Sequence, residues 1–335
     1  MDKLRIYSYI KTRWLLGLTA TQVHNELTAG YRPGVVSYNG LELYRAFYDL
    51  NTRINNILNC ISNISFQPNS PTDANDPFVK RFARRVVHLK VYRPDYVDAT
   101  RFSNVHSLEF YDFLSQQQLT QIRHEYFTHL VYLRMGYIED SDIASIFFQM
   151  IFSNGFPSLY KCILDELTPP DSNHRWLSSP SIRSLIIDGF ALPVYSFILT
   201  SCSNLTHLHW SRILCTDVDI EAVPIRHTHL KRLYIRTINI RNVETILSHV
   251  PNLNRLHIVS DWFRGNNCRP LDFKQLAHIL VRCVPCLQHF DCETMERNPT
   301  DIDTIPEFHL CFRRIQTELV PDGRTRFFTI ERSTL

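Results

Sequence analysis

Residues 205–210 read LTHLHW, residues 230–235 read LKRLYI, and residues 253–258 read LNRLHI. Each of these hexapeptides has apolar residues at its first, fourth and sixth positions and mostly polar residues between them. The fourth and sixth positions are two residues apart, so their side chains share one face of a β-strand. The three hexapeptides therefore predict three short strands that bury the same face.

The same pattern recurs along most of the chain. Its copies are Val86-Leu89-Val91, Val105-Leu108-Phe110, Leu130-Leu133-Met135, Leu159-Cys162-Leu164, Ile182-Leu185-Ile187, Leu205-Leu208-Trp210, Leu230-Leu233-Ile235, Leu253-Leu256-Ile258 and Leu287-Phe290-Cys292. Successive copies start 19 to 34 residues apart, and most intervals are 23 or 25 residues. This period predicts a solenoid, in which each repeat buries its apolar face against its neighbours. The alternative is an irregular α/β domain in which the spacing is a coincidence.

The segments between the copies predict helices that return the chain on the other side of the sheet. Residues 240–250 and 271–284 carry apolar side chains at helical spacing. Residues 143–152 are nearly all apolar, and we expect this segment to be deeply buried.

The strand pattern and its period resemble those of leucine-rich-repeat proteins, in the longer, helix-backed class found behind F-boxes. The common repeat has Asn or Cys a few residues after the strand, whereas this chain has mostly Ile, Phe or Asp there. The resemblance implies an α/β fold, with a leucine-rich-repeat solenoid of about nine strand–helix repeats over residues 80–312. A small all-helical region is expected before it. Residues 67–79 read as a linker, and residues 313–335 as a hairpin that caps the last repeat.

The N-terminal segment, residues 1–40, predicts two short helices. Residues 10–39 read IKTRWLLGLTATQVHNELTAGYRPGVVSYN and resemble the helix-turn-helix of mariner-type transposases. The closest matches are Gly17-Leu18-Thr19-Ala20, His24, Leu27 and Val36-Ser37-Tyr38. That family continues into a basic, DNA-reading third helix, but this chain continues with Gly-Leu-Glu-Leu at residues 40–43. We therefore expect a truncated helix-turn-helix without specific DNA binding.

Residues 41–66, LELYRAFYDLNTRINNILNCISNISF, place apolar residues on one helical face. Core packing alone explains that stripe. The segment also resembles the C-terminal half of an F-box, although the Leu-Pro and Glu-rich helix that open an F-box are absent. The resemblance implies contact with a Skp-type adaptor of cullin–RING ubiquitin ligases through Leu43, Phe47 and Leu50.

Charge and composition narrow the class of protein. The formal net charge is +3, and all of this excess lies in residues 1–40, so no general attraction to nucleic acid is expected from the repeats. The first residues lack the apolar core of a secretory signal, and no apolar run is long enough to span a membrane. The nine cysteines are then expected to be reduced thiols. These features predict a cytoplasmic or nuclear protein.

The sequence offers no motif that supports catalysis. It has neither a phosphate-binding glycine loop nor a nucleophile elbow. His124-Glu125 and His129 are spaced i to i+5, which rotates the second histidine away from a zinc-protease geometry. Cys283 and Cys286 form one C-x-x-C motif without a second pair. We expect no enzyme activity, no metal and no cofactor.

Side chains that alternate with the buried positions of copies six to eight are expected on the concave face. They are His207, His209, Arg232, Tyr234, Arg236, Arg255 and His257, and the ninth copy adds His289, Asp291 and Glu293. Adjacent strands lie about 4.8 Å apart, so these residues predict one basic, aromatic-containing patch. The patch is either a solvated surface or a site for an acidic or phosphorylated protein segment.

Together these features predict a protein-interaction module. The function we favour is an F-box-like substrate receptor of a cullin–RING ubiquitin ligase, which holds its targets on the concave face. One alternative is a leucine-rich-repeat scaffold without a ligase role. The other is a DNA-associated protein that uses the N-terminal helices.

Overall fold

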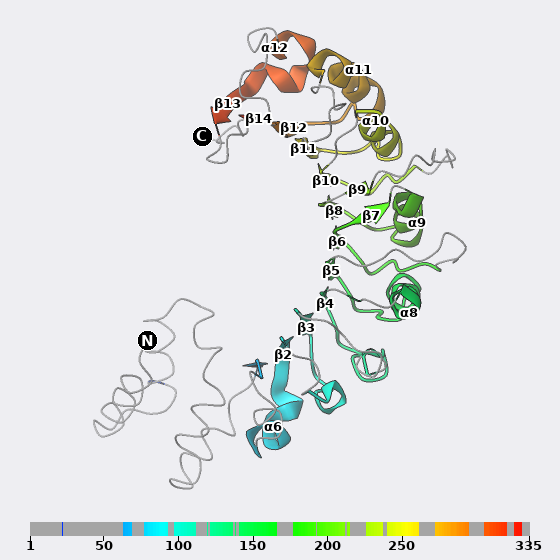
Figure 1. Ribbon diagram of the computed structural model, residues 1–335, viewed down its shortest axis with the longest axis vertical. Helices are drawn as coiled ribbons and strands as arrows, with labels where there is room; N and C mark the ends of the chain where they lie inside the picture. The colour runs from blue at the N-terminus through cyan, green and yellow to red at the C-terminus, as the bar shows by residue number, and fades with distance from the viewer. Residues whose placement is uncertain are drawn as a thin grey trace. The chain divides into compact units, whose positions relative to one another are not determined.

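The computed structural model divides the chain into two compact units, Met1–Leu130 and Val131–Leu335. It describes residues 22, 63–68, 77–92, 97–111, 119, 121–136, 138, 141–165, 177–191, 193–211, 213–214, 226–236, 240–260, 272–294, 305–319 and 325–329. Figure 1 labels most of the helices and strands of both units. Leu43, Phe47 and Leu50, like nearly all of residues 1–66, lie outside the described residues.

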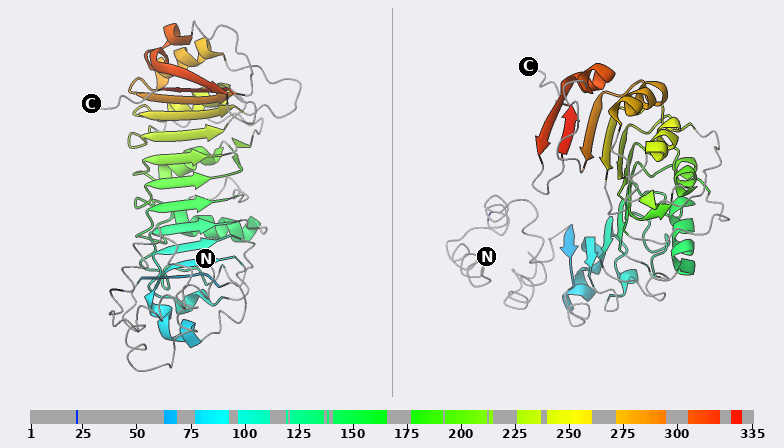
Figure 2. Two further views of the ribbon diagram at one scale, coloured as in Figure 1. Left: turned by 90° about the vertical axis from the view of Figure 1, so that its left-hand side faces the viewer. Right: turned by 45° about the horizontal axis from the view of Figure 1, so that its top comes forward.

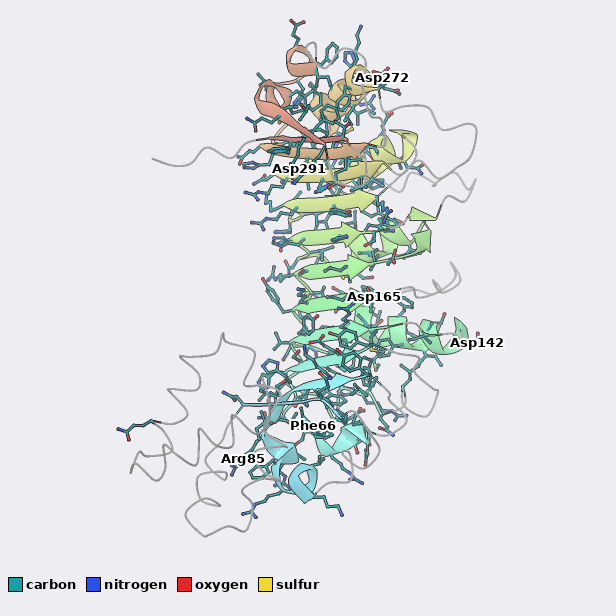
Figure 3. All side chains as sticks on the ribbon, turned by 60° about the vertical axis from the view of Figure 1, so that its left-hand side comes forward. Phe66, Arg85, Asp142, Asp165, Asp272 and Asp291 are labelled. Carbon is teal, nitrogen blue, oxygen red and sulfur yellow. The ribbon has the colours of Figure 1, made fainter. Side chains whose placement is uncertain are left out.

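The described part of the first unit is a short parallel sheet with the strand order β1-β2-β3. Its strands are β1 (Ile64–Phe66), β2 (Val86–Val91) and β3 (Ser107–Phe110). Its helical elements are α6 (Pro77–Phe82), η2 (Ala83–Arg85) and η4 (Ala99–Arg101). Phe66, labelled in Figure 3, packs against Phe102 with ring centroids 5.7 Å apart.

Two boundaries expected in this unit are wrong. Residues 41–66 were expected to be helical to their end, but residues 64–66 form β1, with Ile64 and Phe66 buried on one face. The linker expected over residues 67–79 ends earlier, because α6 begins at Pro77. Proline suits a first helical position, since it has no N–H to leave unsatisfied there.

The second unit contains a long, open sheet. Its parallel strands are β4 (Tyr132–Met135), β5 (Lys161–Leu164), β6 (Ser184–Ile187), β8 (His207–Trp210), β10 (Arg232–Arg236), β11 (Arg255–Ser260) and β12 (His289–Thr294). They pair in this order, as the stacked strands in Figure 2 show. A separate two-stranded sheet pairs β7 (Phe190–Ala191) with β9 (Ile213–Leu214).

Helices of the second unit lie on one side of its sheet (Figures 1 and 2). They are α8 (Ser141–Phe152), α9 (Pro193–Ser201), α10 (Ile240–Ser248) and α11 (Phe273–Cys283). The helices expected in residues 240–250 and 271–284 are therefore present. The Asp272 side chain caps α11 by accepting hydrogen bonds from the backbone N–H groups of Lys274 and Gln275.

Strand register confirms the repeat pattern in this unit. Leu185 pairs with Leu208, Leu208 with Leu233, and Leu233 with Leu256. These fourth positions are at most 2% exposed, as are Cys162 and Phe290. Equivalent residues therefore stack from strand to strand, and the core is continuous along the sheet.

Helix α8 differs from expectation, because it is not deeply buried throughout. Phe147, Phe148 and Ile151 are buried, but Ile146 is 68% exposed. A helix that covers one face of a sheet keeps another side toward solvent, whatever the polarity of the residues there.

The C-terminal end of the second unit carries an antiparallel hairpin. Strand β14 (Thr325–Thr329) pairs with both β12 and β13 (Ile315–Leu319). Between β12 and this hairpin lie α12 (Ile305–Phe308) and η6 (Leu310–Arg314). Phe327 is fully buried, so the hairpin extends the core beyond the last repeat.

His227 joins three consecutive repeats. Its backbone N–H donates to the His249 carbonyl at 2.7 Å, and its Nδ1 accepts from the Leu230 N–H at 3.1 Å. Its Nε2 must then carry the proton, which it donates to the Cys202 carbonyl at 2.9 Å. A second proton on the ring would remove the bond from Leu230, so this site favours neutral imidazole. Burial lowers the pKa of His227, although the bond to Cys202 works in the opposite direction.

We expect the free energy of unfolding to fall as the pH falls below about 6.5, the ordinary pKa of histidine. Burial lowers the pKa of six described histidines: His88, His207, His209, His227, His257 and His309. Between pH 6.5 and the lower pKa that each ring has in the folded state, the unfolded chain binds more protons than the folded chain. The stability that these six neutral rings contribute is therefore fully present above pH 6.5. That contribution is lost as the pH falls through their folded-state pKa values.

Urea midpoints at pH 7.5, 6.5 and 5.5 measure this effect. His227→Gln, which removes one titrating ring, should make the dependence shallower. An unchanged midpoint over this range would contradict the prediction.

Candidate protein-binding face

Two rows of side chains run across the strands on the sheet face away from the helices. We call the first the cation row, and it consists of Lys161, Ser184, His207, Arg232, Arg255 and His289. We call the second the ring row, and it consists of Ile163, Ile186, His209, Tyr234, His257 and Asp291. On each strand the two rows are two residues, or about 6.6 Å, apart. Neighbours within a row lie about 4.8 Å apart.

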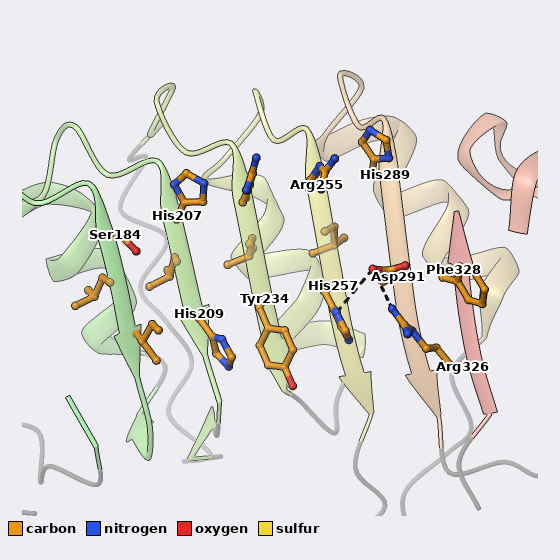
Figure 4. A pocket seen from close by; sticks show the side chains of 16 residues that line it. Ser184, His207, His209, Tyr234, Arg255, His257, His289, Asp291, Arg326 and Phe328 are labelled. Atoms are coloured by element: carbon orange, nitrogen blue, oxygen red, sulfur yellow. Dashed lines mark ion pairs between the residues drawn. The ribbon is translucent and has the colours of Figure 1, made fainter. Parts of the chain in front are cut away.

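From β6 onward the two rows line an open groove of about 410 Å³, which crosses β6, β8, β10, β11, β12 and β14. Of the seven patch residues on copies six to eight, six line it: His207, His209, Arg232, Tyr234, Arg255 and His257. Arg236 is not among the lining residues. It lies two residues beyond the ring row on β10 and pairs with Val259. Figure 4 shows His207, Arg255 and His289 at one level of the groove and His209, Tyr234 and His257 at the next.

Aromatic side chains of the ring row pack against each other. The centroids of His209 and Tyr234 are 3.8 Å apart, and those of Tyr234 and His257 are 4.6 Å apart. Burial, together with the nearby His257, lowers the pKa of His209. At neutral pH the surface around His209 is therefore aromatic and largely uncharged, with polar ring nitrogens.

The ring row ends in a charged cluster. His257 Nδ1 lies 3.9 Å from Asp291 Oδ2, and His257 Nε2 lies 3.5 Å from Glu293 Oε1. Arg326 Nη2 lies 3.8 Å from the same oxygen of Asp291, as the dashed lines of Figure 4 show. Burial lowers the pKa of His257 despite the two carboxylates, which act in the opposite direction. The cluster thus contains two acids and one guanidinium at neutral pH.

His207 in the cation row has a defined hydrogen-bonding state. The Thr206 hydroxyl donates to the Arg183 carbonyl at 2.9 Å and lies 2.8 Å from His207 Nδ1. Because the hydroxyl has one hydrogen, Nδ1 must be the donor in the second contact, which leaves Nε2 as an acceptor on the neutral ring. Burial and the neighbouring Arg232 both lower the pKa of His207.

The patch was expected to be basic, and its histidines contribute little to that charge. The pKa of each of His207, His209 and His257 is lowered, so these rings are largely neutral at pH 7. The positive charge of the groove comes from Arg232, Arg255 and Arg326, and Lys161 continues the cation row beyond it.

The structure also adds residues that sequence reasoning missed. Arg326 and Phe328 of β14 line the groove, and Phe328 pairs with Asp291. The turn signal between β13 and β14 predicts the hairpin itself. No local signal shows that β14 pairs with β12 and so brings these two side chains to the groove.

The other residues considered for a metal or catalytic site are not among those that line this groove. His129 stacks on His106 at 5.8 Å, and His124 is exposed beside Glu125. Cys283 is buried, while Cys286 is exposed. Within the described ranges, no three His, Cys, Asp or Glu side chains are placed to share a metal ion. None of the helices in those ranges has the length and apolar character to cross a bilayer.

Comparison with known proteins gives likenesses to solved structures alone. No family model matches the chain, and no curated protein matches it. Among solved structures, the chain is similar to the leucine-rich-repeat-containing protein LegL7 from Legionella pneumophila, with a TM-score of 0.39 and 14% sequence identity. The alignment covers 79% of this chain and 89% of that chain.

Proposed function

We propose that this protein is a binding scaffold of the leucine-rich-repeat type, whose groove holds an acidic segment of a partner protein. The observation that carries the proposal is the composition of the cation row. From β5 to β12 this row contains Lys161, Arg232 and Arg255, together with two histidines, and no carboxylate. Such a row attracts acidic groups and disfavours basic ones.

Rigid presentation supports the same function. Each side chain of the row is held on a strand that is hydrogen-bonded to its neighbours, and the opposite face of each strand is in the core. The binding groups are therefore arranged before the partner arrives. Less conformational entropy is lost on binding than for groups on free loops.

Reversing two charges tests the proposal. We expect Arg232→Glu together with Arg255→Glu to reduce capture of the protein's cellular partners at least about tenfold, because attraction becomes repulsion in a partly desolvated groove. Capture by full-length immobilised protein, quantified by mass spectrometry, measures the effect. Capture by the wild type should also weaken with salt.

The matched control reverses the same number of charges elsewhere. Lys80→Glu together with Lys274→Glu changes exposed residues on α6 and α11 and should leave capture intact. If the groove variant retains every wild-type partner at normal strength while folded, the groove is a solvated surface and the proposal fails.

A more specific role than that of a binding scaffold is that of an F-box-like substrate receptor. In that role the N-terminal helices contact a Skp-type adaptor while the groove holds the target. Its support is the sequence resemblance of residues 41–66, and the three adaptor-contact residues lie outside the described residues. A DNA-associated role likewise rests on residues 1–40 and stays an alternative.

We expect the triple variant Leu43→Ala, Phe47→Ala, Leu50→Ala to lose a copurified Skp-type adaptor, because these apolar side chains would form the contact. Partners held by the groove should remain. Quantitative copurification of wild type and variant measures both. An adaptor that is absent from the wild-type sample, or equally present with both proteins, would exclude the receptor role and leave the scaffold.

A further inference from the structure

We propose that the partner segment is phosphorylated, with a phosphoserine or phosphothreonine on the cation row and an apolar side chain two residues away on the ring row. This inference rests on the proposed function and names the ligand of the same groove. The phosphoryl group would lie at Arg232 and Arg255, with His207 beside them.

The position of the two arginines favours a phosphoryl group over a carboxylate. Arg232 and Arg255 are paired in register on adjacent strands, about 4.8 Å apart along the row. Two guanidinium forks together offer more donors than the two oxygens of one carboxylate accept, whereas a phosphoryl group has three acceptor oxygens and a charge of about −2. His207 pairs with Arg232 from the other side, and its Nε2 gains a proton to donate when a dianion lies nearby.

Spacing between the rows defines the second contact. The cation row and the ring row are about 6.6 Å apart, which is also the distance between residues i and i+2 of an extended peptide. A segment lying along the strands can therefore place its phosphoryl group on one row and an apolar side chain on the other. Ile186, His209 and Tyr234 receive that side chain, and burial lowers the pKa of His209, so its ring is largely uncharged at neutral pH.

The open shape of the groove favours a short phosphorylated side chain. The phosphoryl group of phosphotyrosine is separated from the backbone by a whole ring. When it reaches the cation row, the peptide backbone is held farther from the sheet, and a neighbouring side chain no longer contacts the ring row. Phosphoserine and phosphothreonine keep both contacts within reach.

Contacts within the ring row disfavour single-stranded nucleic acid. Binding of that kind relies on exposed aromatic faces on which bases stack. Here Tyr234 lies between His209 and His257, with ring centroids 3.8 and 4.6 Å apart, so neighbouring rings already contact part of the surface on which a base would stack.

The acidic end of the groove sets the position of the ligand. Asp291 and Glu293 repel a dianion, and the nearby guanidinium of Arg326, on the hairpin, lies 3.8 Å from Asp291. The phosphoryl group is therefore expected toward β8, β10 and β11, away from β12.

The test uses immobilised peptide libraries that share random flanking residues and differ in the central residue. The central residue is phosphoserine, phosphotyrosine, glutamate or alanine, and a mixed-sequence single-stranded RNA is the fifth probe. Full-length wild type, Arg232→Glu with Arg255→Glu, Lys80→Glu with Lys274→Glu, and Tyr234→Ser are applied at pH 7.5, and circular dichroism confirms that each variant is folded.

We expect the phosphoserine library to retain at least about tenfold more wild-type protein than the glutamate library, a difference that corresponds to about 1.4 kcal/mol. Sequencing of the library peptides to which protein has bound should show apolar residues selected two positions from the phosphate. The arginine variant should lose binding, the lysine variant should keep it, and Tyr234→Ser should weaken only the apolar selection.

Other outcomes separate the two proposals. Equal, arginine-dependent retention on glutamate and phosphoserine overturns phosphate recognition and leaves the acidic-segment scaffold standing. Preference for phosphotyrosine, or no apolar selection, overturns the two-row arrangement. Arginine-dependent preference for RNA overturns the peptide assignment, and retention that ignores the arginine variant on every probe overturns both proposals.

Discussion

A chain that ends at residue 252 is expected to lose cooperative unfolding and to aggregate. The truncation removes β11, β12, α11 and the hairpin, and with them every partner that β10 has on its C-terminal side. Leu233 and Ile235, now buried, would lie at an open edge, together with the side of α10 that packs on α11. Each repeat buries its apolar face only against its neighbours, so the loss is not confined to the deleted residues.

Size-exclusion chromatography and urea unfolding of the truncated and full-length chains measure this effect. A chain that ends at residue 312 is the graded control. It keeps the parallel strands of the sheet and loses the hairpin with the last two residues of η6, so we expect reduced stability with a remaining transition. If residues 1–252 stay monomeric and unfold as sharply as the full chain, stabilisation by neighbouring repeats is the wrong description.

Trp210→Ala is expected to lower the free energy of unfolding by about 3–5 kcal/mol, the usual cost of removing a large aromatic side chain from a core. Trp210 is fully buried and stacks on Tyr195 at 5.4 Å. It pairs in register with Ile187 and Ile235 on the two neighbouring strands. The cavity left by alanine would therefore open between three repeats and α9, where the backbone has little freedom to close it.

Urea unfolding at pH 7.5 measures this loss. Arg232→Ala, an exposed change on the adjacent strand, should shift the free energy by no more than about 0.5 kcal/mol. A loss below about 1 kcal/mol for Trp210→Ala would mean that the site relaxes around the cavity, and that this part of the repeat is less tightly packed than the structure shows.

The local sequence was sufficient to predict the parallel strands of the long sheet in the second unit, although not β7 and β9. LTHLHW, LKRLYI and LNRLHI alternate apolar and polar residues with the two-residue period of a strand. Alternation also assigns each side chain to a face. All seven patch residues of copies six to eight were expected on the face of the groove, and six of them line it. Nothing beyond nearest neighbours in the chain is needed for this prediction, because a strand's two faces follow from its backbone geometry.

Features that depend on contacts between distant segments were not predictable in this way. Three residues are too few to show a period, so β1 is defined only by its pairing with β2, about twenty residues later in the chain. Arg326 and Phe328 reach the groove because β14 pairs with β12, and no residue near them specifies that partner.

Charge in the groove was also decided by the tertiary structure. The sequence alone determined that histidines and arginines alternate with the core positions of copies six to eight. Whether an imidazole carries a proton depends on how much water it loses and which charges surround it. Burial lowers the pKa of His207, His209 and His257 and keeps these rings largely neutral, whereas a guanidinium group is always charged in proteins. The order of residues thus determined which side chains face the groove, and packing determined which of them are ions, because protonation responds to surroundings that only the folded chain creates.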